Sequence, residues 1–247
     1  MSVSPSYVAL PTTGPLSSAL GHALITMAET TTEASDRYTQ FYEGDHFVPV
    51  AMSSPWFFAG RRWEGSPGYT AQQGLAATAS AGRWFLGVYL IVEGRLDDAK
   101  SWIMSATNRA NDEGRSFADR TPLMTGFADF VGSRRKPDFP TDEYALMDPT
   151  KALSVEVVID RDGQGAGWLL DRAESVVRDV ESVSAVHIFG DQTPDGEARF
   201  TLLWFLDSDA EAHAPSTAEV ERMEAAGYPV QVLAALTPRR MGVAAAG

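Results

Sequence analysis

The sequence predicts an α+β protein in which the order strand–helix–strand–strand–helix–strand occurs twice. Short apolar stretches alternate with segments of helical, amphipathic spacing, which are the two basic signals of secondary structure. The same order of elements lies on both sides of a charged, proline-containing stretch, residues 134–151. The chain has 247 residues, of which 44% are hydrophobic and 21% charged, so it can bury a sizeable core.

In the first half, the apolar stretches are bounded by glycine, proline or polar residues, as strands usually are. We expect these strands at 21–30, 56–65, 82–94 and 126–135. Aromatic and apolar residues at helical spacing predict helices over 31–47 and 95–115. Pro49 is expected to end the first helix, because proline lacks the N–H that a helix interior needs.

The second half repeats this order with different residues. We expect strands at 152–161, 184–191, 199–209 and 229–241, and helices at 165–182 and 216–228. The order in each half is that of a ferredoxin-like unit, a four-stranded antiparallel sheet with two helices on one face. Each sheet then has one bare face, and two such sheets can close on each other into an α+β barrel. The expected division is an arm over 1–19, a first repeat over 20–135, a linker over 136–151 and a second repeat over 152–247.

The net charge of −13 argues against two classes of partner. A strongly acidic chain without a Lys/Arg-rich run is repelled by nucleic acid and by anionic membrane surfaces. The absence of cysteine excludes disulfides and thiolate metal sites. We find neither a signal-peptide pattern nor an apolar run long enough to span a bilayer, so we expect a cytoplasmic protein, either a monomer or a homodimer.

Residues 25–63 resemble the opening of EthD-like proteins of the dimeric α/β-barrel superfamily. The resemblance begins with a helix that ends in an aromatic residue and, four positions later, a histidine. Two prolines and an arginine-bearing strand follow. The matching positions are Tyr42, Asp45, His46, Pro49, Pro55, Arg61 and Arg62. The second half matches only in the order of its elements and has no histidine at the corresponding place.

This resemblance implies a small-molecule pocket between sheet and helices, with one site per chain, in the first half. The superfamily includes cofactor-free monooxygenases, polyketide cyclases, isomerases and haem-dependent enzymes, so the resemblance leaves the reaction open. A single histidine can be an axial haem ligand, but no other feature of the sequence indicates haem. The four histidines are scattered along the chain, and we expect neither a metal nor a cofactor.

His46 is the strongest catalytic candidate, because an imidazole can accept and return a proton near neutral pH. Tyr42, one helical turn earlier, is expected to share its face, and Asp45 is a candidate to orient the ring. The structural alternative is a helix-end histidine that interacts with the last carbonyls of the helix.

Aromatic and arginine side chains are the candidates for substrate binding. The aromatic candidates are Trp56, Phe58, Trp63, Trp84 and Tyr89, although strands also bury such residues in ordinary cores. Arg61 and Arg62 are consecutive on a strand, so at most one of them faces a pocket, where it would bind a carboxylate or an enolate.

These features predict a cofactor-independent enzyme of the lyase, isomerase or cyclase type. Its expected substrate is a hydrophobic small molecule, aromatic or polyketide-like, on which His46 acts as general base. Two alternatives stay open. One is a cofactor-free monooxygenase in the same pocket, and the other is a non-catalytic binding or assembly protein.

Overall fold

The computed structural model describes residues 19–65, 83–147, 152–160, 163, 165–207 and 230–238. The first half consists of β1 (Leu20–Thr30), α1 (Ser35–Phe41), the π-helical segment η1 (Tyr42–Met52), β2 (Phe57–Gly65), β3 (Arg83–Val92), α2 (Leu96–Asp112) and β4 (Thr121–Arg135). After the 3₁₀ helix η2 (Asp142–Met147), the second half consists of β5 (Ala152–Asp160), α3 (Gly167–Asp179), β6 (Val183–Gln192), β7 (Ala198–Leu206) and β8 (Val230–Pro238).

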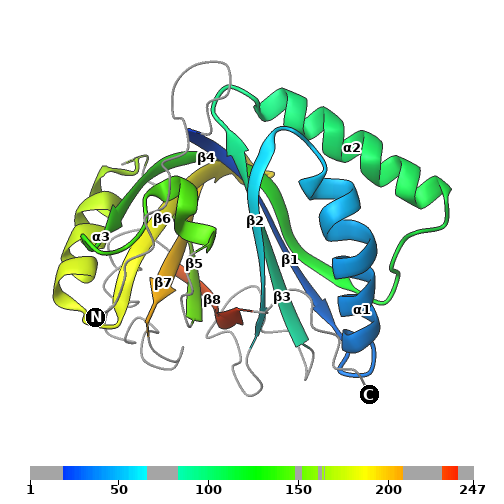
Figure 1. The fold of residues 1–247 in the computed structure, drawn as a ribbon. Helices are drawn as coiled ribbons and strands as arrows, with labels where there is room; N and C mark the ends of the chain where they lie inside the picture. Colours follow the sequence, from blue (N-terminus) through cyan, green and yellow to red (C-terminus); the bar gives the residue numbers. More distant parts are fainter. Residues whose placement is uncertain are drawn as a thin grey trace, which may run out of the picture.

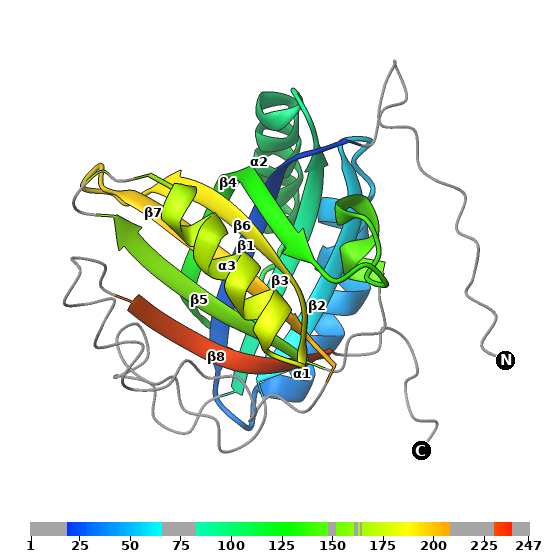
Figure 2. The ribbon, with the colours of Figure 1, turned by 90° about the vertical axis from the view of Figure 1, so that its left-hand side faces the viewer.

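The eight strands form one closed antiparallel barrel in the order β1-β3-β2-β8-β5-β7-β6-β4 (Figures 1 and 2). The two halves join edge to edge at two places. At the first, β4 pairs with β6 from Asp129 opposite Gly190 to Arg135 opposite Ala185. At the second, the last residues of β2 pair with the end of β8, from Trp63 opposite Pro238 to Gly65 opposite Leu236. The protein is therefore an α+β barrel with the ferredoxin-like strand order in both halves.

The strands are apolar on both faces because both faces are covered. Inside the barrel, side chains from both halves form a barrel core that includes Leu86, Val88, Val155, Ala185, Leu203 and Phe205. Outside, α1, η1 and α2 lie over the first-half strands, whereas α3 lies across β5, β6 and β7 on the other side (Figures 1 and 2). A strand that packs on both faces is expected to be a continuous apolar run, and β3 is buried along almost its whole length.

The layer between the first-half strands and their helices is strongly aromatic. We call it the helix-facing layer, and its buried members include Tyr38, Tyr42, Phe47, Phe57, Phe85 and Tyr89. Successive side chains of a strand point to opposite faces, so each strand residue belongs either to this layer or to the barrel core.

The expectation that Pro49 ends the first helix is wrong. Instead of stopping, the helix widens into π-helical turns at Tyr42 and continues to Met52. A proline ring clashes with the carbonyl four residues earlier in an α-helix, and the wider turn changes that spacing. The turn then closes through Ser53, whose N–H donates to the carbonyl of Val48 and whose hydroxyl donates to that of Pro49.

Residues 136–147, expected as part of a linker, pack against the barrel. They include η2, and Phe139, Ala145 and Leu146 are buried in the barrel core. From η2, Asp142 Oδ1 lies 3.2 Å from Nε2 of the buried His187. Residues 1–18 of the expected arm over 1–19 lie outside the described residues, as does the expected helix over 216–228. Among the helices that the structure describes, none is long and apolar enough to cross a membrane.

Candidate functional site

The start of α1 sets the direction in which its aromatic residues point. The Ala34 N–H donates to the Thr31 hydroxyl at 3.2 Å, and the Ser35 hydroxyl donates to the Thr32 carbonyl at 2.8 Å. These bonds hold the turn that leads into α1, and no side chain caps the helix itself. From there, Tyr38 and Tyr42 follow at a spacing of four residues, and both side chains are buried against the sheet.

At the centre of the helix-facing layer, two tyrosine hydroxyls are in contact. The Oη atoms of Tyr42, from η1, and Tyr89, from β3, lie 2.5 Å apart and form a buried hydrogen bond. Tyr89 is 1% exposed and Tyr42 3%, so the pair is shielded from water. We call these two residues the tyrosine pair.

Two strand glycines make room for the tyrosine pair. A Cβ atom at Gly87 would lie 2.7 Å from the Tyr42 Oη, and one at Gly60 would lie 3.0 Å from the Tyr89 ring and 2.6 Å from Met52 Sδ. Real Cβ atoms essentially never lie closer than 3.0 Å to a neighbouring atom, so the contacts with Tyr42 Oη and Met52 Sδ rule out a Cβ at these positions without a shift. Glycine at these positions of β2 and β3 therefore allows η1 to approach the sheet.

Arg62 carries a positive charge into the same layer. Its side chain is 1% exposed, and its guanidinium carbon lies 4.3 Å from the centre of the Phe85 ring and 4.8 Å from that of Tyr42. The Glu43 carboxylate accepts a hydrogen bond from Arg62 Nη1 at 3.2 Å. Since a buried cation stabilises negative charge nearby, Arg62 is placed to favour an oxyanion next to the tyrosine pair.

Two tyrosines of this layer, Tyr89 and Tyr38, are protonated at neutral pH. Burial raises the pKa of Tyr89 well above its ordinary value, and the neighbouring Tyr42 raises it further. Burial and Tyr42 likewise raise the pKa of Tyr38 to about 12, although the nearby charges of Arg62 and Arg120 act in the opposite direction. These hydroxyls can therefore donate hydrogen bonds but cannot act as bases.

His46 lies on η1 next to the tyrosine pair. Its ring is 5.2 Å from that of Tyr42 and stacks at 5.8 Å on Phe41, centre to centre. Partial burial and, to a smaller extent, the charge of Arg120 together lower its pKa to about 4, while the charge of Asp45 opposes the shift. The imidazole is thus neutral at pH 7. It lies inside η1 and not at a helix end, which removes the basis for the capping alternative.

Asp45 is held by the segment that follows α2. Its Oδ1 accepts a hydrogen bond from Arg115 Nη1 at 2.7 Å, and Arg115 also pairs with Glu113. The carboxylate therefore fixes η1 to residues 113–115, seventy positions further along the chain.

The structure divides the predicted substrate-binding residues between two faces. Arg62 and Tyr89 lie in the helix-facing layer with Tyr42, and the half-buried Trp56 packs at its edge, where Arg95 covers its ring. Trp63 and Trp84 belong to the barrel core, and Phe58 packs against that core. Arg61 lies on the barrel side as well, where it donates to the Leu146 carbonyl at 3.2 Å. Alternation along β2 and β3 explains this division for the residues from Arg61 on, whereas the register of β2 is irregular between Phe57 and Ala59, at Phe58.

Other residues of the site were missed from the sequence. They are Tyr38 in the layer, Glu43 on Arg62, Arg115 on Asp45, and Arg120, whose charge acts on both Tyr38 and His46. A signal was available for only one feature. A glycine inside an apolar strand, as at Gly87, indicates that something approaches the backbone closely.

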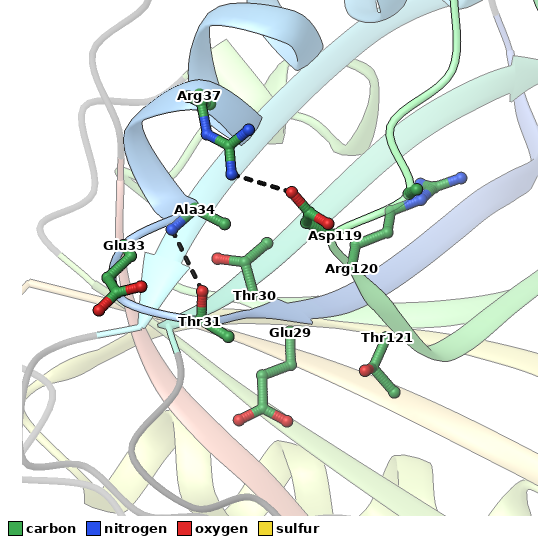
Figure 3. A pocket seen from close by; sticks show the side chains of 10 residues that line it. Glu29, Thr30, Thr31, Glu33, Ala34, Arg37, Asp119, Arg120 and Thr121 are labelled. Carbon is green, nitrogen blue, oxygen red and sulfur yellow. Dashed lines mark hydrogen bonds and ion pairs between the residues drawn. The ribbon is translucent and has the colours of Figure 1, made fainter.

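A pocket of about 630 Å³ lies beside this layer, where β1 ends and α1 begins (Figure 3). Arg120 lines this pocket, so it lies between the pocket and the layer. As for metals, the part of the chain that the structure describes contains no group of three or more His, Asp or Glu residues that could hold an ion.

Comparisons with known proteins give only distant similarities. No protein-family model and no curated protein match the chain. Among solved structures, a "Putative monooxygenase" from Fusobacterium nucleatum subsp. nucleatum ATCC 25586 is similar with 7% identity and a TM-score of 0.48, over 90% of this chain and 95% of that one. An anthrone oxidase-like protein is similar with 13% identity and a TM-score of 0.47, over 89% of this chain and 92% of that one. The fold assignment therefore rests on the strand pairing of the chain itself.

Proposed function

We propose that the protein is a cofactor-independent enzyme of the lyase, isomerase or cyclase type that acts on a hydrophobic, aromatic or polyketide-like small molecule. One observation carries the proposal. A neutral, half-buried His46 lies beside the buried, hydrogen-bonded tyrosine pair, with the Arg62 guanidinium stacked on the Tyr42 ring. A base next to preorganised donors is the arrangement that proton abstraction beside a carbonyl requires. The resemblance of residues 25–63 to EthD-like proteins supports the same location.

In the proposed reaction, His46 accepts a proton from a carbon next to a carbonyl group. The electron pair of the broken C–H bond forms the enolate, whose negative oxygen accepts a hydrogen bond from the Tyr42 hydroxyl. Tyr89 and Arg62 stabilise that charge through Tyr42. The protonated His46 then returns the proton, to a different atom in an isomerisation or to a leaving group in an elimination. Because its pKa of about 4 makes His46 a weak base, most of the rate enhancement must come from stabilisation of the oxyanion.

Proton exchange tests the proposal without knowledge of the natural substrate. The purified protein is incubated in D₂O with an enolisable aromatic ketone, 2-tetralone, and the loss of the α-proton signal is followed by NMR. We expect the wild-type protein to accelerate exchange and His46→Gln to lower the catalysed rate by about 10²–10⁴-fold. Tyr42→Phe is expected to lower it as well, since it removes the donor to the oxyanion.

The matched control is His22→Gln. His22 is a partly buried histidine on β1 that pairs with Asp129 at 2.7 Å, and it should be dispensable for exchange. If wild-type protein and His46→Gln exchange 2-tetralone at the same rate, the assignment of His46 as general base is rejected. Oxygen uptake with anthrone as a second probe separates the monooxygenase alternative from proton transfer alone.

Close packing favours a second candidate, a non-catalytic binding or assembly protein. Tyr42, Tyr89 and Phe47 are all almost fully buried, and they fill the space above Gly60 and Gly87. In this case none of the probes is turned over, and Tyr42→Phe changes stability alone.

A further inference from the structure

The pocket of about 630 Å³ is a separate feature of the molecule. Three segments line it, namely the end of β1 (29–31), the start of α1 (33, 34 and 37) and residues 118–121, where β4 begins (Figure 3). Its lining does not include Tyr42, His46 or Arg62. Its volume lies in the range of about 300–1,000 Å³ that is usual for small-molecule sites.

A buried hydroxyl without a partner lies in this pocket. Thr30 is 3% exposed, and its Oγ1 has no hydrogen-bond partner among the described residues. Leaving a buried polar group unpaired costs about 1–3 kcal/mol, so such a group calls for an explanation. A ligand with a polar group in the pocket would provide the missing partner.

The remaining polar lining carries charges of both signs. Arg37 and Asp119 pair with each other at 2.9 Å, which joins α1 to the 118–121 segment and largely cancels their charges. The carboxylate of Glu33 and the guanidinium of Arg120 then lie on opposite sides of Thr30, both on exposed residues (Figure 3). Arg120 also lowers the pKa of Tyr38, but a guanidinium has five N–H donors and can bind a ligand as well.

We propose that this pocket binds a small zwitterion, a molecule with an ammonium group and a carboxylate group such as a free amino acid. The ammonium group pairs with Glu33, and the carboxylate takes the fork of Arg120. The Thr30 hydroxyl donates to the carboxylate or accepts from the ammonium group. A simple anion would be repelled by Glu29 and Glu33, and a simple cation by Arg120. This inference is independent of the chemistry proposed for His46.

Binding is measured by thermal shift and then by titration calorimetry on the full chain. Each standard L-amino acid is tested singly, and the tightest binder is compared with its amide, which lacks the carboxylate, and with its des-amino acid, which lacks the ammonium group. We expect the parent to bind at least about tenfold more tightly than either analogue, because each loses one charge-assisted hydrogen bond. The proposal is overturned if no amino acid binds, or if one analogue binds as tightly as the parent.

Two variants locate the site, and one serves as control. Thr30→Val keeps the shape and removes only a hydroxyl that has no protein partner, so the unliganded protein should melt at the same temperature or higher while affinity falls several-fold. Arg120→Gln should weaken binding of the amino acid but not of its amide. Arg109→Gln, on α2 and outside the pocket, is the control. Arg120→Gln is not interpretable if it lowers the melting temperature of the unliganded protein. In that case the affinity of Thr30→Val for the amino acid decides whether the ligand binds in this pocket. Unchanged affinity in Thr30→Val would place the ligand elsewhere and refute the assignment.

Discussion

Single side chains of the helix-facing layer have properties that their neighbours impose on them. His46 is the clearest case, because partial burial and the charge of Arg120 move its pKa from 6.5 to about 4. In the unfolded chain the same imidazole has its ordinary pKa. Between these two values the unfolded state binds a proton that the native state does not bind.

This difference predicts how stability depends on pH. Well above pH 6.5, His46 is neutral in both states, so its titration does not change stability. As the pH falls from 6.5 to about 4, protonation of the unfolded chain lowers the free energy of unfolding, and below about pH 4 the contribution is constant. The urea midpoint of His46→Gln should therefore fall less steeply over this window than that of the wild-type protein. Parallel curves would show that the pKa of His46 is not lowered in the folded protein.

Whole elements fit together in this protein because glycine lies where η1 meets the sheet. Gly60 on β2 and Gly87 on β3 present bare backbone to Met52, Tyr42 and Tyr89. Segment η1 can then approach the strands closely enough for the hydroxyls of Tyr42 and Tyr89 to form their hydrogen bond.

Gly87→Ala tests this fit. The new methyl group would lie 2.7 Å from Tyr42 Oη, so we expect a destabilisation of about 1–3 kcal/mol by overpacking. Tyr42→Phe removes the atom that the methyl group meets, so Gly87→Ala should cost less in that background. Chemical denaturation of the four proteins of this cycle measures the coupling. Gly44→Ala is the control, because a Cβ there meets nothing within 4 Å. If the two substitutions change the free energy of unfolding additively, Tyr42 is not the contact that makes a side chain at position 87 unfavourable.

The order of the described elements could be predicted from the sequence, because apolar periodicity distinguishes strands from helices; the helix expected over 216–228 stays a prediction. That η1 continues through Pro49 could not be predicted. The rule that proline ends a helix applies to an α-helix, and the turns of η1 are wider. The sequence also gave no means to decide which of Trp63, Trp84 and Tyr89 share a face with His46. Strand alternation separates Trp84 from Tyr89, but only tertiary packing shows which face carries helices.

The same limit applies to the pocket beside the layer. Its walls come from residues 29–37 and 118–121, which are far apart in the sequence and individually unremarkable. The unsatisfied Thr30 hydroxyl appears only once the strand and the helix are packed together.

At the scale of the whole molecule, two strand pairings join the halves into one barrel, β4 with β6 and β2 with β8, and we call these two pairings the seams. The barrel core contains side chains from both halves, so neither half keeps its interior if the other unfolds. The second half has its own buried charged cluster on the outer face, in which Glu156 accepts from Arg172 Nη1 at 2.9 Å and from Trp204 Nε1 at 3.0 Å.

We therefore expect cooperative unfolding of the entire barrel. Arg172→Met leaves the Glu156 carboxylate buried without its cation and should cost about 3–5 kcal/mol, and Glu156→Gln in the same chain should recover part of the loss. Although both changes lie in the second half, a probe confined to the first half should report the same shifted midpoint. A suitable probe is a fluorophore on a cysteine introduced at the exposed Met104, because the chain has no other cysteine. Separate transitions for the two halves would contradict this coupling.

The closed barrel also limits how copies of this protein can associate. A single ferredoxin-like sheet has outer strands whose backbone N–H and C=O groups can recruit a strand from another molecule. Here every described strand has a neighbour on both sides within the same chain. Self-association through strand addition, whether into a dimer or into fibrils, would first require one of the seams to open. A homodimer that leaves the barrel intact must instead pack through the surfaces of its helices and loops.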